Sequence, residues 1–155
     1  MAIKNLLIVY HSKTGKTQRL ANAVYEGAND QSLETVSVTM KTAAEAGPQD
    51  LVESDGLLLG TPENFGYISG AMKDFFDRTF YEVEGKIQSL PYSTFISAGN
   101  DGSGALRAIR RIANGYPFQE VQEPVVVVGD PTPDDFIRCK ELGLALGAGI
   151  DADIF

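Results

Sequence analysis

Residues 8–24, IVYHSKTGKTQRLANAV, contain the change of hydrophobic period that decides the fold. The apolar run that ends in this stretch, Ile3–Val9, is nearly continuous, as in a parallel strand that is covered on both faces. From Thr17 onward the apolar residues, Tyr25 among them, recur at intervals of three and four, which is the spacing of one buried face of a helix. A buried strand is therefore expected to pass into a helix through the short loop His11–Thr17.

The rest of the chain repeats this alternation of strand and helix. Further strands are predicted at Val36–Met40, Gly56–Gly60, Pro91–Ala98 and Val125–Val128. A turn of helix is predicted at Gln49–Ser54, and helical spacing is predicted through Met72–Phe80, through Ala105–Ile112 and through Phe136–Leu146. Strands that alternate with helices require right-handed crossovers. We expect an α/β fold with an open, doubly wound, five-stranded parallel sheet and helices on both faces, as a single domain over residues 1–155.

Composition and charge narrow the function classes. The formal net charge of -8 argues against nucleic acid, which needs clustered Lys and Arg. A single cysteine, Cys139, excludes an intramolecular disulfide and favours a reducing compartment. The opening apolar run is too short for a signal peptide core or a membrane span. We expect a cytoplasmic protein without membrane contact, and the sequence is compatible with a homo-oligomer.

The first loop, His11–Thr17, has the composition of an anion site. Free amides at the start of a helix favour a phosphate, and Gly15 lets the backbone curl closely around it. Ser12, Thr14 and Thr17 can donate hydroxyl hydrogen bonds. A Walker A loop would need a glycine where Tyr10 stands, and a dinucleotide fingerprint would need three glycines where this loop has one. Helix capping by the hydroxyls, with solvated lysines, is the alternative for this loop taken alone.

Two further loops are expected at the same edge, because ligands of doubly wound sheets bind beyond the carboxyl ends of the strands. The loop Thr61–Ser69 offers two aromatic side chains, Phe65 and Tyr67, on which a flat ring system can stack. The loop Ser97–Gly104 is rich in glycine and exposes backbone groups to the edge of such a ring. The alternatives are aromatics that cover the core edge and an ordinary capped turn.

The stretch Ile8–Val24 resembles the flavodoxin signature, with every fixed position of that pattern filled. The resemblance implies a flavodoxin-like sheet of strand order 2-1-3-4-5 and non-covalent binding of FMN. It assigns the FMN phosphate to the first loop: Ser12, Lys13, Thr14, Gly15, Lys16 and Thr17. Lys16 stands where flavodoxins usually carry Asn, and we expect this lysine to keep or add phosphate affinity.

The stretch Thr61–Thr79, TPENFGYISGAMKDFFDRT, is similar to the second FMN loop of flavodoxin-like NAD(P)H:quinone reductases. The similarity implies that the flavin ring is lined by Pro62, Asn64, Phe65, Gly66 and Tyr67. Glu63 is counted with them, but it departs from the polar or basic residue expected there, and its carboxylate would oppose an anionic reduced flavin. The third loop would contribute Ala98, Gly99, Asn100, Gly102 and Gly104. It lacks the stacking aromatic that carrier flavodoxins often present.

These resemblances imply an FMN-dependent oxidoreductase that passes electrons from NAD(P)H to a quinone or similar small acceptor. The flavin would carry the chemistry, so no catalytic side chain is named. An electron carrier between protein partners is the main alternative, and a flavodoxin-shaped protein that has lost FMN is another. With His11 as the one histidine, no metal site is expected. Arg107, Arg110 and Arg111 share a helical face that is more simply solvated than bound to an NADPH phosphate.

Overall fold

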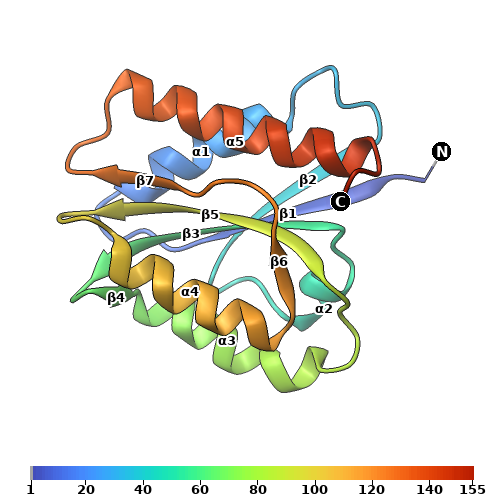
Figure 1. The fold of residues 1–155 in the computed structure, drawn as a ribbon, viewed down its shortest axis with the longest axis horizontal. Helices are drawn as coiled ribbons and strands as arrows, with labels where there is room; N and C mark the ends of the chain where they lie inside the picture. The colour runs from blue at the N-terminus through green and yellow to red at the C-terminus, as the bar shows by residue number, and fades with distance from the viewer. Residues whose placement is uncertain (1) are drawn as a thin grey trace.

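The apolar runs pair in parallel to form one central sheet, as a computed structural model of residues 2–155 shows (Figure 1). The strands are β1 (Lys4–Tyr10), β2 (Val36–Thr42), β3 (Gly56–Asn64), β4 (Tyr67–Ile68), β5 (Leu90–Ala98), β6 (Phe118–Glu120) and β7 (Val125–Val128). The helices are α1 (Lys16–Ala28), α2 (Pro48–Val52), α3 (Gly70–Val83), α4 (Ser103–Gly115) and α5 (Pro133–Asp151).

The strand β1 lies inside the sheet, between β2 and β3. Leu7 pairs with Thr39 of β2 on one side and with Leu57 of β3 on the other, and both pairings are parallel. The order continues as β2-β1-β3-β5-β6, with β7 also paired to β5. The predicted doubly wound parallel sheet and its order are therefore confirmed, because β5 is the fourth long strand and β6 and β7 together form the fifth.

The edge strand is broken in the middle. Its first part, β6, pairs with the start of β5, where Tyr92 lies opposite Glu120. Its second part, β7, pairs with the end of β5, where Phe95 lies opposite Val125. Between them the chain bulges, and the Ser93 hydroxyl donates a hydrogen bond to the carbonyl of Gln122 (2.8 Å). The sequence predicted β7, but β6 is an addition.

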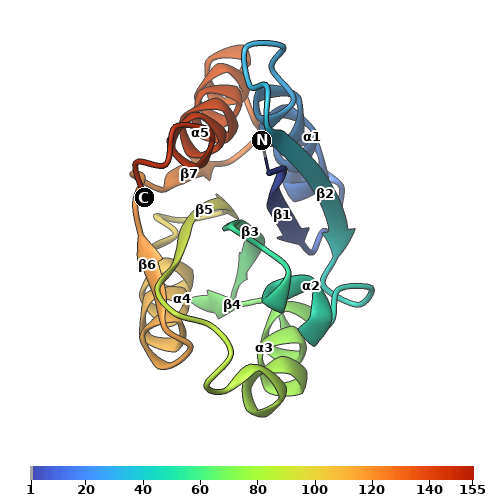
Figure 2. The ribbon, with the colours of Figure 1, turned by 90° about the vertical axis from the view of Figure 1, so that its right-hand side faces the viewer.

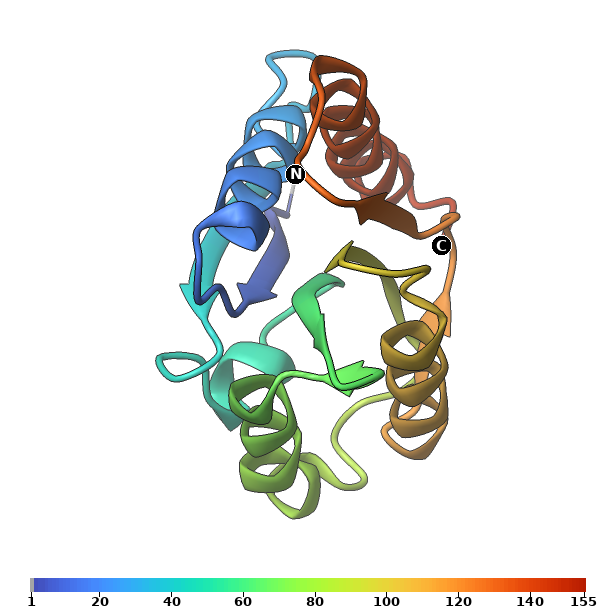
Figure 3. The ribbon, with the colours of Figure 1, turned by 90° about the vertical axis from the view of Figure 1, so that its left-hand side faces the viewer.

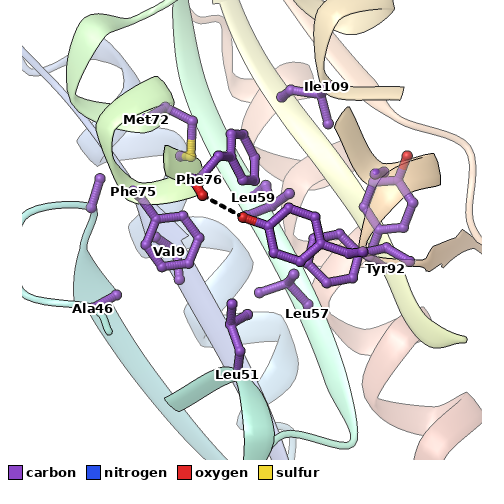
Figure 4. Close-up of a cluster of buried hydrophobic side chains, with 14 of the residues drawn as sticks. Val9, Ala46, Leu51, Leu57, Leu59, Met72, Phe75, Phe76, Tyr92 and Ile109 are labelled. Carbon is purple, nitrogen blue, oxygen red and sulfur yellow. Dashed lines mark hydrogen bonds between the residues drawn. The ribbon is translucent and has the colours of Figure 1, made fainter. Parts of the chain in front are cut away.

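Helices cover both faces of the sheet (Figures 1 and 2). α1 and α5 lie on one face, and α2, α3 and α4 lie on the other. The second face buries Phe75 and Phe76 of α3 against Leu57 and Leu59 of β3 (Figure 4). The hydroxyl of Tyr116, whose pKa burial raises to about 12, donates to the carbonyl of Phe76 (2.8 Å) in this core.

The two helices on the first face differ from expectation in one detail. Tyr25 was predicted on the buried face of α1 but is 38% exposed. Ala23 and Gly27 are buried in its stead, because α5 packs along that side of α1. Within residues 2–155, none of the helices has the length and apolar character needed to cross a membrane.

Glycines allow α1 and α5 to touch backbone to backbone. A β-carbon at Gly143 of α5 would lie 2.1 Å from the carbonyl oxygen of Val24, and one at Gly27 of α1 would lie 1.9 Å from the carbonyl oxygen of Lys140. Neither distance leaves room for a side chain. The contact therefore fixes how close α1, the helix that follows the first loop, can lie to α5.

We predict that Gly143→Ala lowers the free energy of unfolding by roughly 1–3 kcal/mol, because the helices must move apart. Gly115→Ala is the control, since a β-carbon there would have only the Phe80 ring nearby, at 3.7 Å. Urea unfolding followed by circular dichroism measures both. Equal stability of the two variants would show that the helix contact tolerates a methyl group.

Candidate functional site

Parallel pairing brings the carboxyl ends of the long strands to one edge, which Figure 3 views end on. The loop after β1, the β3–β4 hairpin and the loop after β5 lie side by side there, because β1, β3 and β5 are neighbours. The amide of His11 donates to the carbonyl of Gly60 (3.0 Å), which links the first loop to the end of β3. The three predicted loops therefore belong to one surface.

The first loop is curled by its own side chain. Gly15 has a φ of 98°, a left-handed conformation that favours glycine. Its amide donates to the Ser12 hydroxyl oxygen (3.1 Å), which closes the turn. Lys13 and Thr14 are exposed on this turn, whereas Thr17 is only 1% exposed. The structure thus places the predicted phosphate residues on a turn that wraps the start of α1.

The amino terminus of α1 has open hydrogen-bond donors. Its N-cap residue, Gly15, provides no side-chain acceptor. Within the described part of the chain, the amides of Lys16, Thr17 and Gln18 have no hydrogen-bond acceptor. α3 and α5 differ, because Ser69 and Thr132 cap their first turns. The free amides and the helix dipole make this end of α1 a suitable position for an anion.

Lys16 forms an ion pair with a residue of another loop. Its ammonium lies 3.1 Å from a carboxylate oxygen of Asp130, in the loop after β7, and both side chains are well exposed. An exposed pair of this kind contributes little to stability. The predicted phosphate contact of Lys16 therefore stays a prediction, since its ammonium is paired with Asp130 in this structure.

The predicted second loop is a β-hairpin. β3 continues to Asn64, which pairs antiparallel with Tyr67 of β4. The two residues between them, Phe65 and Gly66, have φ values of 52° and 71°, and two such residues are what a type I′ turn requires. Phe65 is fully exposed at the tip and Tyr67 is 42% exposed. The hairpin therefore offers two aromatic surfaces at the edge of the sheet.

The base of the hairpin is fixed to α3. The buried hydroxyl of Thr61 accepts a hydrogen bond from the amide of Ser69 (3.1 Å). The hydroxyl oxygen of Ser69 in turn accepts from the amide of Met72 (3.1 Å), which caps α3. Only the tip is left to project. Pro62, just inside this base, is half-buried.

The third loop follows β5 and leads into α4. Ala98 and Gly102 are buried, whereas Gly99 and Asn100 are exposed. The amide and the hydroxyl of Ser103 both donate to Asp101, at 3.0 and 2.8 Å, and these hydrogen bonds hold the pKa of Asp101 below its usual value. Between β5 and α4 the loop carries no aromatic side chain.

Glu63 turns toward α4. Its carboxylate oxygen Oε2 accepts hydrogen bonds from the amides of Gly104 (3.0 Å) and Ala105 (3.1 Å), in the first turn of that helix. Sequence reasoning had placed this charge toward the flavin ring. The hydrogen bonds instead direct the carboxylate to the start of α4. The two donor amides lie 41 and 42 positions after Glu63 in the chain.

The remaining candidates contribute no site. Residues 2–155 contain no group of three or more His, Cys, Asp and Glu side chains that could hold a metal ion. Arg110 forms a two-pronged ion pair with Glu120, at 2.9 Å for each hydrogen bond, so its guanidinium already has a partner. Arg107 and Arg111 are exposed. Cys139 is buried, and burial raises the pKa of its thiol to about 12.

Comparison with known proteins relates the chain to flavin-binding proteins. The family model described as "Flavodoxin" matches residues 8–141. A "Flavodoxin" of Aquifex aeolicus is 38% identical over 99 residues, which cover 64% of this chain and 52% of that protein. An "NAD(P)H dehydrogenase (quinone)" of Acidithiobacillus ferrooxidans is 32% identical over 121 residues, which cover 66% of this chain and 60% of that protein. The chain thus spans between half and two thirds of the length of these relatives.

Solved structures agree on the fold. A flavodoxin from the domain Archaea superposes with a TM-score of 0.82 at 23% identity, covering 94% of this chain and 98% of that chain. A WrbA-like flavodoxin from Agrobacterium tumefaciens gives a TM-score of 0.81 at 21% identity, covering 97% of this chain and 98% of that chain. At these identities the likeness shows the fold alone.

The hairpin tip carries backbone strain that a substitution can relieve. Phe65 has a positive φ, which costs a non-glycine residue roughly 1 kcal/mol, whereas Asn followed by Gly is a favoured pair in such turns. We predict that Phe65→Asn raises the free energy of unfolding of the FMN-free protein by about 1 kcal/mol. Tyr81→Asn, which removes another exposed aromatic from an α3 position, should give no gain. Urea unfolding would contradict the prediction if both variants were destabilised alike.

The pKa of Asp101 also sets a pH dependence. Because its folded pKa is lowered from 3.8, its contribution to stability is present above about pH 3.8 and is lost as the pH falls through the folded pKa. We predict that Asp101→Asn is less stable than the unmodified protein at pH 7 and that the difference shrinks toward pH 2–3. Thermal unfolding across this range measures the effect. A difference that stayed constant with pH would mean that the carboxylate charge is not involved.

Proposed function

Since the chain belongs to the flavodoxin family, we propose that it binds one FMN at the carboxyl edge of its sheet and acts as an NAD(P)H oxidoreductase. The proposed electron acceptor is a quinone or a similar small molecule. The observation that carries the proposal is the uncapped start of α1, which faces the same edge as the exposed aromatics of the hairpin.

The residues of this edge fit the parts of FMN. The turn from Ser12 to Thr17 and the open amides of α1 suit the phosphate, which carries the charge. The hairpin side chains Phe65 and Tyr67 suit the flat ring, and the glycine-rich third loop suits its polar edge. Bound FMN would supply redox chemistry that no side chain here can perform. The protein would bind and orient the cofactor.

One feature of the site favours an enzyme over a carrier, and one relative is compatible with an enzyme. The third loop has no aromatic that could cover the flavin ring, so one ring face would be left open to a substrate. The quinone-reducing relative from Acidithiobacillus ferrooxidans is 32% identical.

An electron carrier between protein partners is the second candidate. The relative from Aquifex aeolicus, named as a flavodoxin, is 38% identical. The net charge of -8 favours docking to a basic redox protein. In this case, a protein partner would dock against the open face of the flavin.

A ligand comparison tests the binding site. We predict that the purified protein binds FMN at least about 100-fold more tightly than riboflavin, since riboflavin lacks the phosphate and its charge-assisted hydrogen bonds. Quenching of flavin fluorescence measures both dissociation constants. Equal affinities would mean that the first loop does not bind the FMN phosphate. Absence of FMN binding would mean that the protein shares only the fold.

A kinetic assay then separates the two functions. The FMN-loaded protein is mixed with NADH or NADPH and a soluble benzoquinone, and nicotinamide oxidation is followed by absorbance. Steady turnover that requires the quinone is the expected result for an oxidoreductase. Retention of FMN with no nicotinamide oxidation would instead support the carrier.

A further inference from the structure

The hairpin and α4 are joined by a hydrogen-bonded carboxylate. Oε2 of Glu63, on the hairpin, accepts from two successive amides of α4, those of Gly104 and Ala105. Both bonds end on one oxygen atom, and the Glu63 side chain is only half-exposed. Hydrogen bonds to an ionised acceptor are about twice as strong as neutral ones.

A close backbone contact accompanies these bonds. A β-carbon at Gly104 would lie 1.9 Å from the carbonyl oxygen of Gly66, at the tip of the hairpin. The first turn of α4 therefore touches the hairpin at two places, one through the Glu63 carboxylate and one through bare backbone. Both contacts involve Gly104, whose amide donates to Glu63 and whose bare backbone lies against Gly66.

The same contacts change the electrostatics of the edge. Asp101 accepts from the amide of Ser103, so carboxylates occupy the amides of all three residues that begin α4. At the start of α1, by contrast, the N-cap residue offers no side-chain acceptor. The start of α1 therefore stays available to an external anion. The positive end of α4 is neutralised by the carboxylates of Asp101 and Glu63.

We infer that Glu63 is a positioning residue that holds the hairpin against the third loop before FMN binds. The inference rests on the proposed function, because these two segments are the proposed ring-binding half of the site. A short two-stranded hairpin has little stability of its own, and the carboxylate connects it to a helix that is anchored in the core. A site that is already formed does not spend binding free energy on ordering its loops.

Glu63 also has an electrostatic role in this arrangement. Its negative charge lies beside the proposed ring site, although the amides of α4 partly balance it. A negative charge near the ring disfavours the gain of electrons by bound FMN. Glu63 therefore keeps the midpoint potential of the cofactor lower than it would be with a neutral side chain.

Two substitutions separate the tether from the charge. Glu63→Ala removes both. Glu63→Gln removes the charge, but its amide oxygen can still accept from the amides of α4, because one oxygen accepts both bonds in the unmodified protein. Amide hydrogen exchange on the FMN-free protein reports the tether directly, and fluorescence titration and a redox titration report the consequences for FMN.

We expect Glu63→Ala to speed amide exchange at Gly104 and Ala105 and to raise the dissociation constant of FMN about tenfold. Glu63→Gln should restore most of the protection and most of the affinity. Both variants should shift the midpoint potential of bound FMN toward less negative values. Unchanged exchange in Glu63→Ala, or unchanged FMN affinity, would overturn the inference.

Two further variants serve as controls. Asp101→Asn removes a carboxylate from the same helix terminus without breaking a contact to the hairpin, so its effect on FMN affinity should be smaller than that of Glu63→Ala. Gly104→Ala keeps the Glu63 carboxylate but pushes the hairpin away from α4, so it should weaken FMN binding. If Asp101→Asn matched Glu63→Ala, helix capping would explain the effect and the tether would not.

Failure of the proposed function is distinguishable from failure of this inference. An unmodified protein that did not bind FMN would refute the function, yet the exchange measurement would still test whether Glu63 joins the hairpin to α4. An unmodified protein that bound FMN, with Glu63→Ala binding it equally well, would refute only the inference.

Discussion

Parallel pairing of β1 with β3, and of β3 with β5, is the constraint on which the site depends. It brings the carboxyl ends of three strands to neighbouring positions, so that segments far apart in sequence form one surface (Figure 3). The packing of the helices on the sheet then fixes where each of these segments ends. Contact of α1 with α5 through Gly27 and Gly143 fixes the helix at which the first loop ends. The start of α1, where we propose the anion site, is thus positioned by the packing of α1 against α5.

The helix termini at this edge suggest how an acidic protein would hold the phosphate of the proposed FMN. Repulsion between the net charge of -8 and a phosphate would oppose this binding. In the proposed function, the affinity would come from short-range donors, namely the open amides of α1 and the hydroxyls of the first turn. Side chains satisfy the first turns of α3 and α5, and carboxylates satisfy that of α4. The pattern of capped helix termini would therefore direct the proposed phosphate to α1.

Much of the fold could be predicted from the sequence, because the strands are buried on both faces and their apolar runs are long. The change of period near Thr17 identified the first strand, loop and helix, and the resemblance supplied the strand order. β6 was missed, since three residues between Pro117 and Val121 give too short a pattern. The β4 hairpin was missed because Phe65 occupies a turn position where Asn or Gly is usual.

For the candidate site, the sequence predicted the segments that meet at the edge but not the contacts between their residues. Local composition indicated that Ser12–Thr17 could hold an anion and that Phe65 and Tyr67 stood at the edge. It gave no sign that Glu63 would bind amides 41 and 42 positions later, or that Lys16 would pair with Asp130. Such pairs are set by which strands become neighbours. A single sequence carries no local signal for them.

The break between β6 and β7 has a consequence for how the molecule behaves in a crowded cell. An uninterrupted outer strand is a template on which another chain can add, and repeated addition leads to fibrils. Here the outermost strand runs for three residues, bulges, and resumes after Pro124, which has no amide hydrogen to offer. An incoming strand would lose its register at the bulge, so the interruption protects this border against self-association.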